Sequence, residues 1–404
     1  MTTTSSPPAP QPAGRIPGGV WVLGFVSLLM DISSEMIHSL LPLFMVTVLG
    51  SSALTIGLIE GMAEATALMV KVFSGTLSDY LGRRKGLALL GYGLGALTKP
   101  LFAIATGSGL ILTARLLDRV GKGIRGAPRD ALVADLTPPE LRGAAFGLRQ
   151  SLDTVGALLG PLLAVGLMLL WHNDFRAIFW LAVVPGLASV TLLAIGLREP
   201  KTADHHARSN PLRRDNLRRL GKPYRWVVLI GALFTLARFS EAFLVLRAQQ
   251  NGVALALVPL VMVAMNLVYA LSAYPFGRLS DQISHRTLLV WGLLVLVAAD
   301  LVLAASPHWG ALLLGVMLWG IHLGMTQGLL AAMVAASAPA ELRGSAFGFF
   351  NLVCGLAMLL AGLLAGLLWD TLGAAFTFYA GAACCLLTLL LLGRYPQPTP
   401  GSQP

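Results

Sequence analysis

The chain has 404 residues, of which 56% are hydrophobic and 12% charged, with a formal net charge of +10 and a mean hydropathy of +0.74. Soluble domains are about one-quarter charged, so this composition excludes an ordinary water-soluble protein and indicates many membrane spans. The positive charge alone would suit nucleic-acid binding, but its distribution along the chain indicates membrane topology instead, and we expect no nucleic-acid partner.

The first 18 residues are rich in Pro, Ser and Thr and are expected to form a disordered tail. They lack the basic region and short apolar core of a cleaved signal peptide, so we expect the first apolar run to remain in the mature protein. The three cysteines (Cys354, Cys384 and Cys385) lie in apolar segments. This pattern indicates small apolar side chains rather than a disulfide framework.

Twelve apolar runs follow the tail, and each is close to the length of about 20 residues that crosses a bilayer as a helix. They occupy residues 19–49, 54–74, 86–106, 109–136, 144–171, 175–197, 225–248, 253–276, 287–306, 309–336, 344–369 and 372–394. The first, fourth and tenth exceed one span, so we expect these helices to tilt or to extend beyond the membrane. The sequence therefore predicts an all-α polytopic membrane protein with 12 transmembrane helices.

One long polar stretch divides these runs into two sets of six. The expected organisation is a cytoplasmic tail (1–18), a six-helix half (19–197), a cytoplasmic linker loop (198–224), a second six-helix half (225–394) and a short cytoplasmic tail (395–404). We interpret the linker as a solvated loop, and a regulatory or lipid-binding site there is a further possibility.

Basic residues concentrate in alternate loops. Nine Lys and Arg residues lie within 198–225, and the other loops on the same expected side add Arg83, Arg84, Lys85, Arg142, Arg278, Arg286, Arg343 and Arg394. The opposite loops carry little beyond Arg176 and Arg247. Because basic loops stay in the cytoplasm, both termini are expected to be cytoplasmic, in a plasma membrane or, in a bacterium, the inner membrane.

Two short motifs recur at nearly the same offset. The tripeptide LSD at 77–79 returns at 279–281, an offset of 202, and ELRGAAFG at 140–147 returns as ELRGSAFG at 341–348, an offset of 201. In each half the first motif follows the second span and the second follows the fourth span. The repeat indicates a duplicated six-helix unit, as in several transporter folds.

The stretch GTLSDYLGRRK at 75–85 is similar to the signature of the loop between spans two and three in the major facilitator superfamily, Gly-x-Leu-Ala-Asp-Arg-x-Gly-Arg-Arg/Lys-Lys. The residues shared with that signature are Gly75, Leu77, Asp79, Gly82, Arg83, Arg84 and Lys85, and the departures are Ser78 and Tyr80. The second copy, GRLSDQISHR, is degenerate. The resemblance implies the fold of this superfamily, with two six-helix halves related by a pseudo-twofold repeat.

The resemblance also implies a gating role for this loop. Asp79 would lie at the N-terminal end of the eleventh span, where unpaired amides favour an anion, or would pair with Arg129. Gly75 and Gly82 would allow close approach, and Arg83 and Arg84 belong to the same motif. The alternative is a basic turn whose only role is to fix the orientation of the chain in the membrane.

The fifth span contains GLRQSLDTVGALLGP, whose Gly147, Gly156, Gly160 and Pro161 resemble a motif of proton-coupled exporters in this superfamily. Small residues there would let the span approach a neighbour closely, and Pro161 would bend it. Ala164 and Val165 replace the usual Gly-Gly, and ordinary small-residue packing is the alternative.

Charges inside apolar spans are costly unless paired or hydrated, so each is a functional candidate. The resemblance implies that spans one, four, seven and ten line a central cavity. The candidates for substrate binding or proton coupling are then Asp31, Glu35, Arg115, Asp118, Arg119, Arg238 and Glu241. The superfamily's span-four arginine corresponds to either Arg115 or Arg119.

A carboxylate that changes its hydration and its partners between two conformations can load a proton on one side of the membrane and release it on the other. Asp31 and Glu35 opposite an arginine of span four suit this role, and a static charge network is the alternative. We expect no cofactor, with the proton gradient as the energy source. His38 and His322 form no tight cluster, so we expect no metal site.

The expected function is secondary active transport of a small molecule by alternating access, with proton-coupled efflux, by a monomer in the bilayer. The alternative is a permease for a siderophore or metal chelate. An enzyme would need a nucleophile and base, or metal ligands, at one depth, and the sequence shows no such cluster, so we expect no enzymatic activity.

Overall fold

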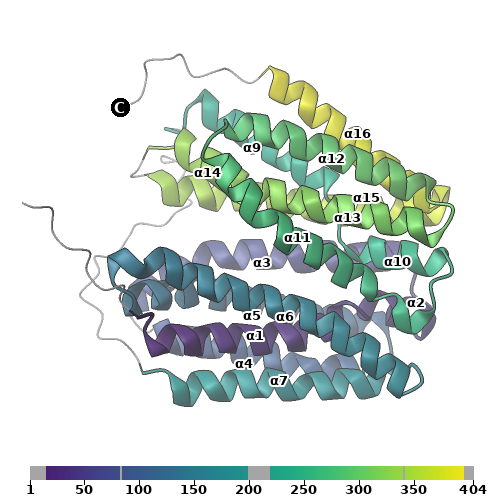
Figure 1. The fold of residues 1–404 in the computed structure, drawn as a ribbon, viewed down its shortest axis with the longest axis horizontal. Helices are drawn as coiled ribbons and strands as arrows, with labels where there is room; N and C mark the ends of the chain where they lie inside the picture. Colours follow the sequence, from purple (N-terminus) through teal and green to yellow (C-terminus); the bar gives the residue numbers. More distant parts are fainter. Residues whose placement is uncertain (1–14, 82–83, 199–218, 340–341, 395–404) are drawn as a thin grey trace, which may run out of the picture.

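The computed structural model describes residues 15–81, 84–198, 219–339 and 342–394, and for residues 75–81 it describes the backbone only. All regular structure in these ranges is helical (Figure 1). The first half contains α1 (Gly18–His38), α2 (Leu41–Thr47), α3 (Ala53–Leu81), α4 (Arg84–Ala103), α5 (Ser108–Leu136), η1 (Pro139–Leu141), α6 (Arg142–Leu170) and α7 (Phe175–Gly196). The second half contains α9 (Lys222–Ala237), α10 (Ala242–Gln250), η2 (Leu255–Leu257), α11 (Leu260–Ser280), α12 (His285–Ala305), α13 (Trp309–Thr326), α14 (Leu329–Ser337), α15 (Arg343–Leu372) and α16 (Ala374–Gly393).

Eleven helical segments in the described part of the chain are long and apolar enough to cross a membrane. The twelfth predicted span is α5, which has 29 residues but carries eight charged side chains. Its polarity reflects its position in the bundle, because these charges face other helices and cavities rather than lipid. The predicted all-α architecture with twelve spans is confirmed.

Three of the predicted spans are each divided into two helices. The first divides between α1 and α2 ahead of Pro42, whose ring removes a backbone donor. The seventh divides between α9 and α10 at Arg238–Glu241. The tenth divides between α13 and α14 at Gly328, where the backbone φ of +77° is the left-handed conformation that glycine adopts readily. The predicted spans 19–49, 225–248 and 309–336 therefore each consist of two helices.

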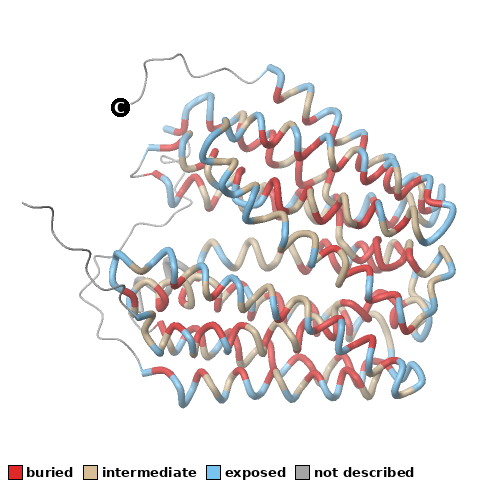
Figure 2. Tube along the Cα trace, viewed as in Figure 1, coloured by how far each residue is buried: buried red, intermediate tan, exposed pale blue. Residues whose placement is uncertain are grey.

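The surface that faces away from the other helices is apolar. Figure 2 shows exposed residues along the outward sides of the helices and buried residues between them. Leu97 is 69% exposed and Ile195 is 79% exposed, and Leu390 and Leu271 are exposed to a similar degree. Large aliphatic side chains in this arrangement are stable against lipid, which agrees with a membrane location.

The two halves pack against each other mainly through α3 and α15, which lie side by side (Figure 1). Glycines make this contact: a Cβ added to Gly57 would lie 2.1 Å from the carbonyl oxygen of Gly362, and one added to Gly362 would lie 2.2 Å from the carbonyl oxygen of Gly57. The two backbones therefore touch, as in transmembrane helix pairs built on small residues. A second contact joins α11 and α6, where Asn266 donates to the carbonyl of Ala157 at 3.2 Å.

We name the two ends of the bundle by the chain connection between the halves. The linker face is the end at which α7 finishes and α9 begins, and the far face is the opposite end, where α3 begins and α15 finishes. At the far face, α2 contacts α10, and Asp370 of α15 bonds to the first turn of α3. The halves are therefore joined at the far face.

Candidate functional site

A cavity lies between the halves, lined by α1, α2, α3 and α5 on one side and by the break between α9 and α10 on the other; we call it the central cavity. Its walls carry four cationic and four carboxylate side chains, namely Arg115, Arg119, Lys122 and Arg238, and Glu35, Glu60, Glu64 and Glu241. Five of the seven candidate residues thus line one polar chamber: Glu35, Arg115, Arg119, Arg238 and Glu241.

A second cavity adjoins the first, and we call it the vestibule. It shares Glu35, Glu64 and Lys122 with the central cavity and reaches Arg129 and Asp130 near the end of α5. Because α5 ends at the linker face, the central cavity is reached from that face. Asp31, another candidate residue, lines the vestibule rather than the central cavity.

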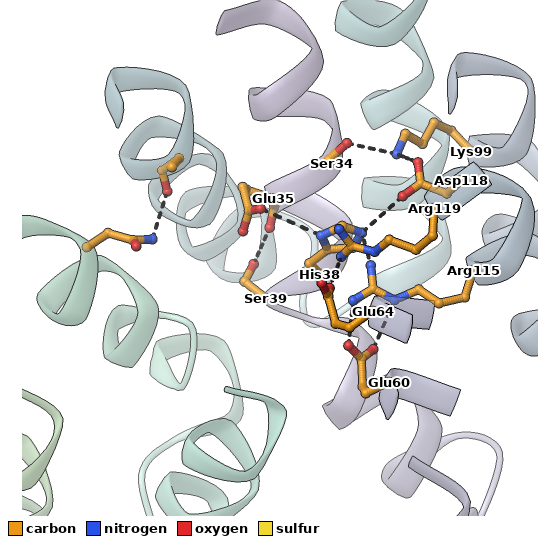
Figure 3. A network of polar contacts seen from close by, with 12 residues as sticks. Ser34, Glu35, His38, Ser39, Glu60, Glu64, Lys99, Arg115, Asp118 and Arg119 are labelled. Carbon is orange, nitrogen blue, oxygen red and sulfur yellow. Dashed lines mark hydrogen bonds and ion pairs between the residues drawn. The ribbon is translucent and has the colours of Figure 1, made fainter. Parts of the chain in front are cut away.

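Arg115 is held by a bidentate ion pair. Its Nε donates to Glu60 Oε1 at 3.0 Å and its Nη2 to Glu60 Oε2 at 2.5 Å, while its Nη1 contacts the ring of His38 (Figure 3). Arg115 is 3% exposed and Glu60 is 6% exposed. A buried fork of this kind fixes the guanidinium in one orientation.

Asp118 faces away from the cavity, toward α4. Its Oδ1 accepts from Lys99 Nζ at 2.8 Å, and the same ammonium donates to the hydroxyl of Ser34 at 3.0 Å. Lys99 is fully buried. His38 Nε2 lies 3.7 Å from the other carboxylate oxygen of Asp118, so the His38 ring links this pair to Arg115 (Figure 3).

Arg119 and Glu35 complete the network. Arg119 Nη2 lies 3.2 Å from Glu64 Oε1, and Glu35 Oε1 lies 3.6 Å from His38 Nδ1. Sequence reasoning left the span-four arginine open between two residues, and both line the cavity, each with its own glutamate. The contacts connect α1, α3, α4 and α5, an arrangement that can brace these helices as well as bind a ligand.

The glycines of the fifth span lie against the first. A Cβ on Gly156 would be 2.9 Å from Cβ of Asp31, and a Cβ on Gly160 would be 2.6 Å from Cβ of Glu35. α6 therefore approaches the face of α1 that bears both candidate carboxylates. Pro161 is buried within α6, and a Cβ on Gly147 would meet nothing within 4 Å.

Arg238 and Glu241 flank the break in the seventh span. Arg238 follows the last residue of α9 and Glu241 precedes the first residue of α10. Each side chain carries the charge that suits its helix end, since a cation is favourable at a helix C-terminus and an anion at an N-terminus. Both line the central cavity from the second half.

The loop motif is described only in part. Only the backbone of Gly75 and Asp79 is described, and Gly82 and Arg83 lie outside the described residues. Arg84 is buried and paired with Asp135 of α5.

Arg129, the expected partner of the loop aspartate, lies on α5 in the vestibule. Its Nε donates to Asp130 at 3.2 Å, and its Nη1 donates to Ser27 at 3.2 Å and lies 3.8 Å from Asp153. Asp153 also accepts from Arg149 at 2.5 Å.

Sequence reasoning missed two connections. One is the ion pair of Lys99 and Asp118, whose signal in the sequence is two opposite charges in the neighbouring apolar runs 86–106 and 109–136. His38 was weighed only as a metal ligand, whereas here it links Arg115, Asp118 and Glu35. His322 bonds to the carbonyl of Gly292 at 2.8 Å and does not line the central cavity.

Comparisons with known proteins agree with this architecture. The model of the Major Facilitator Superfamily matches residues 23–246 and 227–404. The uncharacterized MFS-type transporter MJ1317 of Methanocaldococcus jannaschii is 33% identical over 379 residues, which cover 92% of this chain and 94% of that protein. The multidrug resistance protein MdtH of Yersinia pestis is 25% identical over 365 residues, covering 87% of each.

Solved structures of low identity share the fold. The nucleoside transporter NupG superposes with a TM-score of 0.78 at 14% identity, covering 94% of this chain and 100% of that one. The human organic anion transporter MFSD10 gives a TM-score of 0.68 at 20% identity, covering 93% and 99%. The family model, which matches nearly the whole chain, and the relative that is 33% identical show that the chain belongs to the major facilitator superfamily.

Proposed function

We propose that the chain exports a polar small molecule by alternating access and couples this export to proton inflow. The observation that carries the proposal is the charged central cavity, which lies between two halves joined at the far face and is reached through the vestibule from the linker face. A membrane-embedded polar chamber accessible from one side at a time is what alternating access requires.

The direction of the open side follows from the basic loops. The linker and the other loops at the same end hold nearly all of the loop Lys and Arg residues, so we assign the linker face to the cytoplasm by the positive-inside rule. The structure then represents the inward-facing state, ready to take cargo from the cytoplasm. Both termini and the linker are cytoplasmic in this assignment.

Proton coupling is assigned to Asp31 and Glu35. Asp31 lines the vestibule, and its side chain has no hydrogen bond or ion pair within 4.0 Å among the described residues. Glu35 lines both cavities, and within the described part of the chain its carboxylate has one ion-pair contact, at 3.6 Å from His38. Both residues pack near the glycines of α6, so a movement of α6 against α1 would change their surroundings.

The relatives named as multidrug resistance proteins support export. Proteins named multidrug resistance protein MdtH match most of this chain at 25% identity, and the fifth span carries the exporter-like glycine motif. The alternative of a siderophore or metal-chelate permease has no support from these relatives. Monomeric function fits a site built within one chain.

The test uses the purified chain in proteoliposomes that contain a fluorescent pH indicator, under an imposed pH gradient. Ethidium, alanine, alanyl-alanine and citrate are the probes. We expect at least one to drive proton movement, Asp31→Asn to abolish gradient-driven flux while leaving exchange, and the exposed control Asp281→Asn to behave as the parent. Absence of proton-linked flux for every probe would refute the coupling, and unchanged flux in Asp31→Asn would refute that residue's role.

A further inference from the structure

We infer that the central cavity takes a dipolar molecule, one that carries both an ammonium and an acidic group, rather than a lipophilic cation. The inference rests on the proposed function, because it assumes that the central cavity holds the cargo. The charged side chains of the cavity divide into those with partners within the chain and those without.

Four of the charged side chains in the cavity form ion pairs with each other. Arg115 is bound by both oxygens of Glu60, and Arg119 lies 3.2 Å from Glu64. These pairs neutralise themselves, and breaking one to bind a ligand would leave its buried partner uncompensated, which is costly. A ligand is therefore recognised by the remaining charges.

Three charged side chains of the cavity have no hydrogen bond or ion pair within 4.0 Å among the described residues. They are Lys122 on α5 and Arg238 and Glu241 at the break between α9 and α10. Lys122 is exposed to the cavities, and the other two are partly exposed. These groups carry both signs, so a ligand with one charge would attract some of them and be repelled by the others.

The carboxylates also face one another across the boundary between the halves. Glu241 of the second half lines the central cavity together with Glu35 and Glu64 of the first half. When the halves approach to enclose a cargo, these like charges repel. An ammonium group between them offsets that repulsion, and Lys122 and Arg238 then receive the acidic end.

A simpler account exists for two of the three residues. Arg238 and Glu241 complement the ends of the broken helix, and this would hold with an empty cavity. It does not account for Lys122, which is on the continuous helix α5, lines both cavities and carries no ion pair there. The two accounts differ in what they predict for ligands with one end blocked.

The test measures binding to the full-length protein in detergent by isothermal calorimetry and thermal shift. The probes are alanine, alanyl-alanine and phosphoserine, each with its N-acetyl form and, for the first two, its C-terminal amide, with ethidium as the lipophilic cation. We expect at least one zwitterion to bind, and blocking either end to weaken its affinity at least about tenfold, the effect of losing one ligand–charge contact.

Variants identify which residue binds the ammonium group of the ligand and which binds its acidic group. Glu241→Gln should remove the discrimination against the N-acetyl form, and Lys122→Gln should remove the discrimination against the amide. The matched controls are Glu140→Gln and Lys222→Gln, which are exposed and outside both cavities. Equal binding of blocked and free forms, binding of ethidium alone, or no binding by any zwitterion would overturn the inference.

Failure of this inference is distinguishable from failure of the transport proposal. Transport of ethidium in proteoliposomes would leave the transporter assignment standing and reject the dipolar cargo. A zwitterion that binds with the expected discrimination but shows no flux under any gradient would support the dipolar ligand and reject the transport proposal.

Discussion

The carboxylate of Asp370, in the last turn of α15, accepts a hydrogen bond of 2.8 Å from the backbone amide of Leu54, in the first turn of α3. Its other oxygen accepts from the amide of Ala53 at 3.1 Å. The first amides of a helix have no partner within that helix, so an aspartate supplied by the opposite half caps α3. One side chain thereby couples a helix end to the contact between the halves.

Replacing Asp370 with alanine should favour the state that is open at the far face. Loss of a capping acceptor costs about 1 kcal/mol, or a factor of about five in the equilibrium. Spin labels on cysteines at Ser52 and Gln250, which lie at the far face on opposite halves, should report a larger population of long distances. Asp370→Asn keeps an acceptor oxygen and should shift the distribution less. Identical distributions for all three proteins would contradict a latch.

The contact between α3 and α15 should not tolerate a methyl group at Gly57. The added Cβ would lie 2.1 Å from the carbonyl oxygen of Gly362, so the helices must separate, at a cost of about 1–3 kcal/mol for an overpacked contact. We expect Gly57→Ala to lower the thermal stability and to widen the same spin-label distances. Gly93→Ala on α4 is the control, because its Cβ would meet nothing within 4 Å. Equal effects of the two substitutions would refute the backbone contact.

Replacing one partner of the ion pair between Arg115 and Glu60 should destabilise the protein more than replacing both partners. Arg115→Met leaves a buried carboxylate without its partner and should cost about 3–5 kcal/mol of stability. The double variant Arg115→Met with Glu60→Met should recover most of this loss. Unfolding monitored by tryptophan fluorescence in one detergent gives both values. Additive losses in the double variant would show that the two side chains act independently.

Asp300 of α12 offers a stabilising substitution. The side chain is fully buried, and neither of its oxygens has a hydrogen-bond partner among the described residues. A buried carboxyl group without hydrogen-bond partners costs free energy, so replacing it with leucine, an apolar side chain of the same branched shape, should raise the free energy of unfolding by about 1–3 kcal/mol. We expect Asp300→Leu to unfold at a higher temperature than the parent, and the exposed Asp281→Asn not to differ. A lower unfolding temperature would mean that the carboxylate is satisfied in the folded protein.

Much of the fold was predictable because lipid imposes a simple rule on sequence. Apolar length located the twelve spans, and the repeated motifs divided them into two halves. Even α5 could be placed despite its eight charges, because its length and its position between apolar runs required a span there. The tight packing of Gly156 and Gly160 also followed from their size and spacing.

The site was predictable only as a set of candidates. A helix that is apolar on most sides gives little information about its rotation, so hydropathy could not show that Asp118 turns toward Lys99 on α4 rather than toward the cavity. The break at Arg238 contains neither proline nor glycine and leaves no local mark in the sequence. The ion pair of Asp118 with Lys99 and the break between α9 and α10 both depend on neighbours that are distant in the chain.

Among the described residues, the ion pairs all join side chains of the first half, from Glu35 to Asp153. The second half contains a cluster of aromatic rings around Phe239, which packs on Trp319 at 5.3 Å and on Phe378 at 5.5 Å between ring centroids. Ion pairs weaken when their carboxylates become protonated, whereas contacts between aromatic rings carry no charge. The two copies of the duplicated unit are therefore stabilised by different interactions, and a fall in pH acts mainly on the first.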